Sequence, residues 1–459
     1  MKFILSARND RFTKLIDRVR LFSIGFIRHV FGEKIGDFNG LFLKLIIIIV
    51  LFRFLYYSTM PSFITAGDSQ TYIDYSFQDM LRLKFTNMRT PIYPLIIRLC
   101  SYISPINYLH MVALLQCLCS LISLILFWKI IRLFSDSKRI CTVFMLLYGC
   151  NPQIFAWDKA ILTESLAISG TVLFLYLIIL YLHKPAQRYG VLISVLLFFL
   201  TLLRPSFMLF MFYYIIFLGT RFILITEQRK FIVLPFVASA FTIMLISIYS
   251  FLFEKQWGLF SITSVMPQQL LYVSIKEGFY SAGSNDAIVK DIHTLLSVGG
   301  DGETVSSVTQ LWPIIDHYGI KTIQEFAINS FINCPKEYAK YIIDTIFTHG
   351  KGFFSMGYIF GEQRKFSSIV GRIYSNSMIL TGSVFSIVRL SHAYVFTISE
   401  FILWIRHRKN HVLSWIHFGL WVFMLSIILS TFILTNAAFD RTMVHIIPFV
   451  YVSILLLFI

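Results

Sequence analysis

Long apolar runs recur along almost the whole chain, and a short polar turn separates each run from the next. A helix needs about 20 apolar residues to cross the hydrocarbon core of a bilayer, and most of these runs approach that length. The pattern therefore predicts an all-α polytopic membrane protein with about ten transmembrane helices. The expected spans are 43–58, 108–131, 140–157, 161–182, 189–205, 206–225, 231–253, 378–405, 412–434 and 442–459.

The composition agrees with a membrane protein and excludes several other classes. Hydrophobic residues make up 57% of the chain and charged residues only 14%, which lies outside the range of soluble domains. The formal charge of +16 is divided among short Lys/Arg clusters between apolar runs, so we expect membrane lipids and no nucleic acid as partners. The six cysteines show neither a disulfide framework nor zinc spacing. No nucleotide-binding glycine-rich loop is present in the sequence.

The loops between the spans give the orientation. If the basic N-terminus is cytoplasmic, alternate turns are also cytoplasmic, at 129–139, 183–188, 221–230 and 406–409. Each of these turns is rich in Lys or Arg, as the positive-inside rule requires. The remaining loops, which hold most of the acidic residues and a few isolated arginines, are then expected on the outer face.

The same pattern divides the chain into four parts. Residues 1–42 carry basic residues between apolar residues at helical spacing, which predicts a cytoplasmic interfacial helix. Residues 43–253 form an N-terminal transmembrane module whose outer loop is 59–107. A small, helical extracytoplasmic loop domain is expected at 254–377, followed by the C-terminal transmembrane helices at 378–459.

The outer loop after the first span holds the most informative residues. Asp68 lies between a glycine and a serine, and Tyr72, Arg89 and Tyr93 follow it. An Asp at this position fits two roles. It could cap a helix over residues 70–83, or it could take part in chemistry at the membrane boundary.

Further charges on the expected outer face are candidates for binding. Glu164 opens an apolar helix, where the helix dipole favours an acid. Arg204, before a helix-breaking proline, and Arg441 both flank apolar helices on the side where positive-inside bias does not place them. A phosphate bound by the guanidinium groups would explain both arginines. Salt bridges to Glu164 or Asp440 are the alternative.

The order of several short motifs resembles that of a known family. The motifs are Gly67-Asp68-Ser69 with Tyr72, Arg89-Thr90-Pro91-Ile92-Tyr93-Pro94, Leu162-Thr163-Glu164, Leu203-Arg204-Pro205, Asn333-Cys334-Pro335-Lys336-Glu337-Tyr338, and Asp440-Arg441 with His445 and Pro448. Together they resemble the GT-C membrane glycosyltransferases. The nearest resemblance is to the bacterial enzymes that use polyprenyl-phosphate sugars, including lipid A aminoarabinose transferases and relatives of protein O-mannosyltransferases.

The resemblance implies a function and a place. A sugar would pass from a polyprenyl-phosphate donor to a glycan, lipid or protein acceptor, on the outer face of the bacterial cytoplasmic (inner) membrane. Asp68 would act as the base of an inverting transfer, and Arg204 and Arg441 would bind the donor phosphate. The residues expected to orient the substrates are Glu164, Tyr72, Arg89, Tyr93 and His445.

The motif departs from the family at one position that bears on metal binding. Ser69 stands where the family has a second acid beside the aspartate. A carboxylate pair for a divalent metal is therefore absent from this motif, and metal-independent transfer without a cofactor is the preferred interpretation.

Two other classes stay open at this point. A polysaccharide polymerase or ligase shares the plan of many spans with one large outer loop. A non-enzymatic carrier, or flippase, of lipid-linked sugars should place its charges near the midplane of the membrane and show repeated halves. The charges singled out above lie instead at one face, which favours the transferase.

Overall fold

The computed structural model describes residues 37–84, 88–298, 308–350, 368–386, 388–407, 411–434 and 443–458. The chain forms two compact units, residues 1–51 and 52–459, and all packing described below lies within the second. In the described ranges the chain is helical and has no strand. An isolated bridge joins Ile64 to Ala160.

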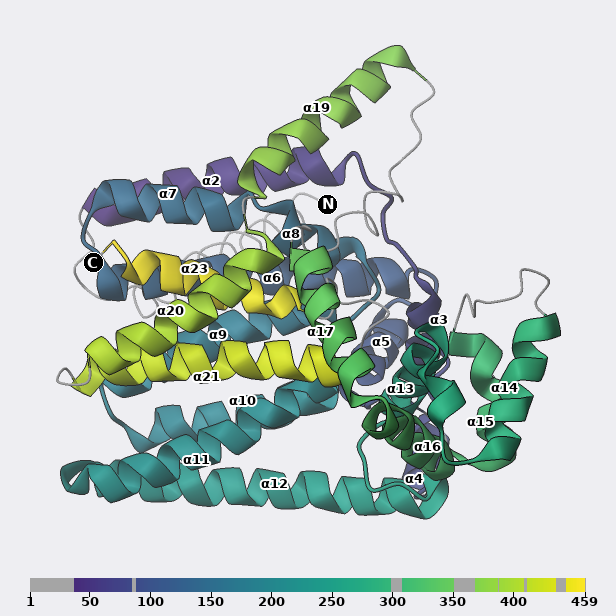
Figure 1. Ribbon diagram of the computed structural model, residues 1–459. Helices are drawn as coiled ribbons and strands as arrows, with labels where there is room; N and C mark the ends of the chain where they lie inside the picture. The colour runs from purple at the N-terminus through teal and green to yellow at the C-terminus, as the bar shows by residue number, and fades with distance from the viewer. Residues whose placement is uncertain are drawn as a thin grey trace, which may run out of the picture. The chain divides into compact units, whose positions relative to one another are not determined.

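Figure 1 shows the order of the helices. The N-terminal half contains α2 (Asp37–Tyr57), α3 (Gly67–Ile73), α4 (Phe77–Leu81), α5 (Ile92–Ile103), α6 (Tyr108–Phe134), α7 (Lys138–Gly149), α8 (Pro152–Phe155), η1 (Ala156–Lys159), α9 (Glu164–His183), α10 (Gln187–Leu203), η2 (Pro205–Phe207), α11 (Met208–Leu224), η3 (Thr226–Gln228) and α12 (Arg229–Trp257). The C-terminal half contains α13 (Val265–Lys276), η4 (Phe279–Ala282), α14 (Asp286–Val298), η5 (Val308–Leu311), α15 (Trp312–Tyr318), α16 (Ile320–Asn333), α17 (Pro335–Gly350), α19 (Ile369–Phe385), α20 (Leu390–Arg406), α21 (His411–Leu434), η6 (Val444–Ile446) and α23 (Ile447–Leu456).

Several helices have the length and composition of membrane spans, as the sequence predicts. Six in the described part of the chain meet both conditions, and a seventh is obtained if α7 and the 152–159 segment, bent by 45°, form one broken span. The six are Gly40–Tyr57, Tyr108–Phe134, Glu164–His183, Pro205–Leu224, Thr226–Trp257 and Val412–Leu429. The apolar helices α10 and Val444–Leu456 are shorter. The protein is thus a multi-pass helical membrane protein, while the count of about ten spans stays a prediction.

The expectation of one continuous span at 378–405 is wrong. Helix α19 ends at Phe385 and α20 begins at Leu390. Side chains of the 151–153 turn form hydrogen bonds with the residues between the two helices. Gln153 Nε2 donates to the carbonyl oxygen of Val388 at 3.0 Å, and Ser386 Oγ donates to Asn151 Oδ1 at 3.4 Å. Contacts between distant parts of the chain therefore interrupt a run that is locally apolar.

The predicted break at Arg204 is confirmed. Helix α10 ends one residue earlier, Arg204 has an extended backbone (φ −148°, ψ 116°), and α11 starts at Met208. Pro205 has no backbone N–H to continue the helix. Close packing then joins α10 to α12, since a Cβ at Gly190 would lie 2.4 Å from Pro235 Cγ.

The segment after α12 is helical, as predicted for part of 254–377, and it has a hydrophobic core of its own. Buried residues from α13, α14, α15 and α16 pack together. They include Leu271, Ile275, Ile292, Ile315 and Phe326. These helices can therefore bury apolar surface among themselves, while their position outside the membrane stays a prediction.

Two expectations fall on residues that the structure does not describe. Most of the predicted interfacial helix within residues 1–42 lies outside the described ranges, and so do Asp440 and Arg441.

Candidate functional site

Asp68 is held in the first turn of a short helix. The hydroxyl of Ser69 accepts a hydrogen bond from the backbone N–H of Ala66 at 2.8 Å, and it donates to the carbonyl oxygen of Ile161 at 2.9 Å. The predicted role of Asp68 as the cap of a helix over 70–83 is therefore wrong. The helix begins before Asp68, and the serine side chain binds the N–H that precedes it.

Arg89 fixes the carboxylate of Asp68. Its Nη2 lies 2.7 Å from Asp68 Oδ1, and its Nε donates to Thr71 Oγ1 at 2.9 Å. The guanidinium also lies over the ring of Tyr72, with Cζ 4.9 Å from the ring centroid. The Asp68 side chain is 37% exposed and that of Arg89 is 15% exposed. The result is an oriented carboxylate that solvent or a ligand can reach.

Tyr93 supports this arrangement from below the surface. Its side chain is fully buried, and its ring packs edge-on against Tyr72 with centroids 5.1 Å apart. Its hydroxyl donates to Gln116 Oε1 at 2.7 Å, and Gln116 Nε2 donates to the carbonyl oxygen of Ala160 at 2.7 Å. Tyr93 thus packs beneath Tyr72 and does not itself reach the surface.

Glu164 and Arg204 form an ion pair next to these residues. Arg204 Nη1 lies 3.2 Å from Glu164 Oε1 and 3.4 Å from the hydroxyl oxygen of Thr163. Glu164 is fully buried as the first residue of α9, and the Arg204 side chain is 11% exposed. Of the two explanations that the sequence left open for Arg204, the structure contains the salt bridge.

The turns that hold these residues meet at one end of the helices. Thr90 Oγ1 donates to the carbonyl oxygen of Leu203 at 3.4 Å, which joins the loop of Asp68 to the turn of Arg204. Thr263 Oγ1 donates to the carbonyl oxygen of Met88 at 2.6 Å, which joins the segment after α12 to the same loop. Loops from alternate connections therefore come together, as the predicted topology requires.

His445 lies at this end as well. It is 1% exposed, and its ring packs at a tilt of 39° against Phe207, with centroids 5.1 Å apart. The structure thus brings His445 to the turn after Arg204 but buries it below the surface. Arg441 stays a prediction, because it lies outside the described ranges.

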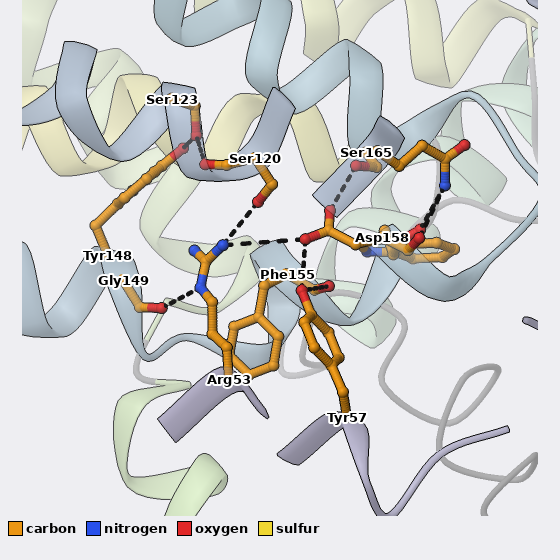
Figure 2. A network of polar contacts seen from close by, with 11 residues as sticks. Arg53, Tyr57, Ser120, Ser123, Tyr148, Gly149, Phe155, Asp158 and Ser165 are labelled. Atoms are coloured by element: carbon orange, nitrogen blue, oxygen red, sulfur yellow. Dashed lines mark hydrogen bonds and ion pairs between the residues drawn. The ribbon is translucent and has the colours of Figure 1, made fainter. Parts of the chain in front are cut away.

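Figure 2 shows a buried polar network around Asp158 that the sequence analysis did not assign to the site. Asp158 accepts hydrogen bonds from Tyr57 Oη at 2.6 Å and from Ser165 Oγ at 2.5 Å, and Arg53 Nη1 lies 3.9 Å from it. Arg53 also donates to Ser120 Oγ and to the carbonyl oxygen of Gly149, each at 2.8 Å. A single arginine within the apolar run 45–57 was the signal for this network, because a buried charge needs a partner.

A second buried pair lies between α20 and α21. His417 Nδ1 is 2.5 Å from Glu400 Oε2, and both side chains are almost completely buried. In sequence, Glu400 and His417 are isolated polar residues in apolar runs. Such residues mark candidate functional or pairing positions inside a membrane.

The described residues contain no group of three or more His, Cys, Asp or Glu side chains placed to hold a metal ion. The hydroxyl of Ser69, at the position of the family's second acid, is occupied by the two hydrogen bonds given above. Metal-independent transfer therefore stays a prediction from the sequence.

Comparison of the chain with models of known families, with curated proteins and with solved structures found no match in any of the three. The resemblance to GT-C glycosyltransferases therefore rests on the short sequence motifs alone.

Proposed function

We propose that this chain is an integral membrane glycosyltransferase. It transfers a sugar from a polyprenyl-phosphate donor to a glycan, lipid or protein acceptor at the outer face of the bacterial cytoplasmic membrane. The observation that carries the proposal is the partly exposed carboxylate of Asp68, held by Arg89 beside the Glu164–Arg204 ion pair. A transfer of this kind needs a positioned base and a fixed cation near the departing phosphate.

The proposed reaction is an inverting displacement. Asp68 accepts the proton of an acceptor hydroxyl while that oxygen forms a bond to the anomeric carbon of the sugar. The bond from this carbon to the phosphate oxygen breaks, and its electron pair leaves with the polyprenyl phosphate. A positioned base contributes about 10² to 10⁴ in rate.

Arginine side chains would stabilise the leaving phosphate. Glu164 and Thr163 fix the guanidinium of Arg204, so it needs no reorganisation when charge develops nearby. In the proposal, Arg441 supplies a second guanidinium, because it precedes the last apolar run in the sequence. Tyr72 and Arg89 orient the acceptor around Asp68, and Tyr93 and His445 support these positions from inside the protein.

The topology completes the proposal. About ten spans, with a cytoplasmic N-terminus, place Asp68, Glu164, Arg204 and the helices of 254–377 on one side of the membrane. The meeting of these loops at one end of the helices supports this arrangement. The helices around α13 would cover or select the acceptor.

Mass spectrometry of surface glycans and lipid A tests the function. Cells with the intact protein should carry a glycosylated species that is missing from cells without it. Restoring the intact gene should restore that species. Identical glycan and lipid A profiles in the two strains would contradict the proposal.

A carrier of lipid-linked sugars is the second candidate, because one observation favours it. The Glu400–His417 pair lies inside two helices rather than at their ends, and a carrier needs ionisable groups within its spans. In cells lacking a carrier the lipid-linked precursor would accumulate unflipped, whereas loss of a transferase leaves the precursor accessible at the outer face.

A further inference from the structure

Gln116 is a fully buried amide within α6, a helix with the length and composition of a membrane span. The N–H groups and the oxygen of a buried amide need hydrogen-bond partners, because leaving them unpaired in an apolar interior is costly. The partners of Gln116 therefore show which parts of the protein this side chain holds together.

The amide nitrogen of Gln116 binds the turn before α9. Its Nε2 donates to the carbonyl oxygens of Ala160 at 2.7 Å and Asp158 at 3.1 Å, and the carbonyl oxygen of Trp157 lies 3.4 Å away. Three carbonyl oxygens decide which end of the amide faces the turn, because a carbonyl cannot donate to the amide oxygen. Oε1 therefore faces away from the turn, and it accepts a hydrogen bond from the hydroxyl of Tyr93 at 2.7 Å.

The same turn binds the short helix of Asp68. The backbone N–H of Ile64 donates to the carbonyl oxygen of Lys159 at 2.8 Å, and the N–H of Ile161 donates to the carbonyl oxygen of Ile64 at 2.9 Å. Ser69, next to Asp68, donates from its hydroxyl to the carbonyl oxygen of Ile161 at 2.9 Å. The turn that the buried amide holds is thus one support of the Asp68 helix.

The oxygen of Gln116 holds a second support, which reaches the Asp68 carboxylate itself. Tyr93 packs edge-on against Tyr72, with ring centroids 5.1 Å apart. The guanidinium of Arg89 lies over Tyr72, and its Nη2 is 2.7 Å from Asp68 Oδ1. A chain of direct contacts therefore leads from the buried amide to the carboxylate.

The 157–161 turn is anchored on its other side as well. The side chain of Asp158 lies between Tyr57 and Ser165, and both hydroxyls donate to it (Figure 2). Gln116 thus connects an anchored turn to Tyr93 and fixes the distance between them. This matters for chemistry, because a catalytic group that is displaced by about 1 Å can lose about 100-fold in rate.

We propose that Gln116 is a positioning residue of the Asp68 site. From inside α6 it holds the 157–161 turn and Tyr93, and these two supports keep the Asp68 carboxylate oriented toward the acceptor hydroxyl. The role in transfer rests on the proposed function, whereas the hold on the turn can be measured without any substrate.

Hydrogen exchange of the purified full chain in detergent tests the hold on the turn. Gln116→Met keeps the approximate size of the side chain and removes its donors and its acceptor. Peptides that contain Ile64 and Ile161 should exchange at least about tenfold faster, because the N–H groups of both residues bond across the turn. Gln153→Met is the matched control, because Gln153 is 1% exposed but donates to the carbonyl oxygen of Val388. It should leave the exchange of these peptides unchanged.

Product formation in cells that contain equal amounts of each inserted protein tests the positioning role. Gln116→Met should lower the glycosylated product about 10- to 100-fold, whereas Gln153→Met should leave it within about twofold of the unaltered chain. Tyr93→Phe removes one hydroxyl and keeps the ring beside Tyr72. It should lower the product about 3- to 10-fold, which is the value of one hydrogen bond.

A double variant distinguishes positioning from a general structural role. If Gln116 acts on transfer only through Asp68, Gln116→Met should not lower the residual product of Asp68→Asn any further. A further loss of about 10-fold or more in the double variant overturns the positioning role.

The outcomes distinguish this inference from the transferase proposal. Unchanged exchange of the Ile64 and Ile161 peptides in Gln116→Met overturns the hold on the turn, whatever the activity. Equal product from Gln116→Met and the unaltered chain overturns the positioning role and leaves the transferase standing. Absence of product from the unaltered chain overturns the transferase and the role in transfer, and exchange still decides the hold. If Gln116→Met does not fold, Tyr93→Phe replaces it in both assays, and unchanged product in that variant overturns the positioning role.

Discussion

Replacing Asp68 by asparagine separates a role in structure from a role in chemistry. The substitution Asp68→Asn preserves the shape of the side chain and an oxygen that can accept from Arg89, but it removes the negative charge. The ion pair is short, at 2.7 Å, yet 37% of the Asp68 side chain is exposed, so solvent screens it. Its loss should destabilise the protein by at most about 1 kcal/mol.

The expected effect on turnover is much larger. Loss of a general base lowers the rate about 10² to 10⁴ times, and a hundredfold loss corresponds to about 2.7 kcal/mol in activation free energy. The thermal midpoint of the purified protein should move by only about 2 °C. Transfer should fall at least about a hundredfold, measured from the glycosylated product in cells that contain equal amounts of each inserted protein.

Asp74→Asn is the matched control. Asp74 lies at the end of the same short helix, is exposed, and accepts hydrogen bonds from Gln70 Nε2 at 2.8 Å. It should leave both the product and the thermal midpoint nearly unchanged. Normal product formation by correctly inserted Asp68→Asn protein would refute the proposed base and leave Asp68 as the partner of Arg89 alone.

The remaining predictions concern the ion pairs and the topology. Arg204→Met should destabilise the protein by about 3 kcal/mol in chemical unfolding, because it removes the ion-pair cation beside the fully buried Glu164. Adding Glu164→Gln should recover much of this loss, and additive effects in the double variant would contradict the coupling. Cysteines introduced at Ser284 and Lys409 should react differently with a membrane-impermeant reagent in intact cells, the first labelled and the second protected, and labelling of both would refute the topology. If the protein is a transferase, Glu400→Gln should leave the glycan profile of the cells unchanged. Loss of the glycosylated product in that variant would favour a carrier.

The elements that depend on local pattern could be predicted from the sequence. The apolar runs predict the main helices, because each run is apolar enough by itself to leave water as a helix. Pro205 predicts the end of α10, because proline has no backbone N–H to donate. The start of α9 at Glu164 follows from the same local reasoning.

What depends on contacts between distant residues could not be predicted. The break between α19 and α20 is held by Gln153, which is 235 residues away from Val388 in sequence. Arg53 and Asp158 are likewise far apart along the chain, and nothing local tells which acid will meet which arginine. From the sequence, Arg204 could bind either a phosphate or a nearby acid, and only the fold identifies Glu164 as its partner.

The position of charges along the helices bears on the choice between a transferase and a carrier. A transferase needs an accessible carboxylate where two substrates meet. The Asp68 side chain is 37% exposed, whereas Glu400 and Asp158 are buried and already hydrogen-bonded. A carrier would need its buried charges to change partners as the protein alternates between two states. The pair Glu400–His417 joins two helices that are consecutive in sequence and pack closely against each other, an arrangement that holds them together rather than letting them separate. The accessible carboxylate of Asp68 therefore favours the transferase. The buried Glu400–His417 and Arg53–Asp158 pairs have a structural role, because they join apolar helices that each carry an isolated charge.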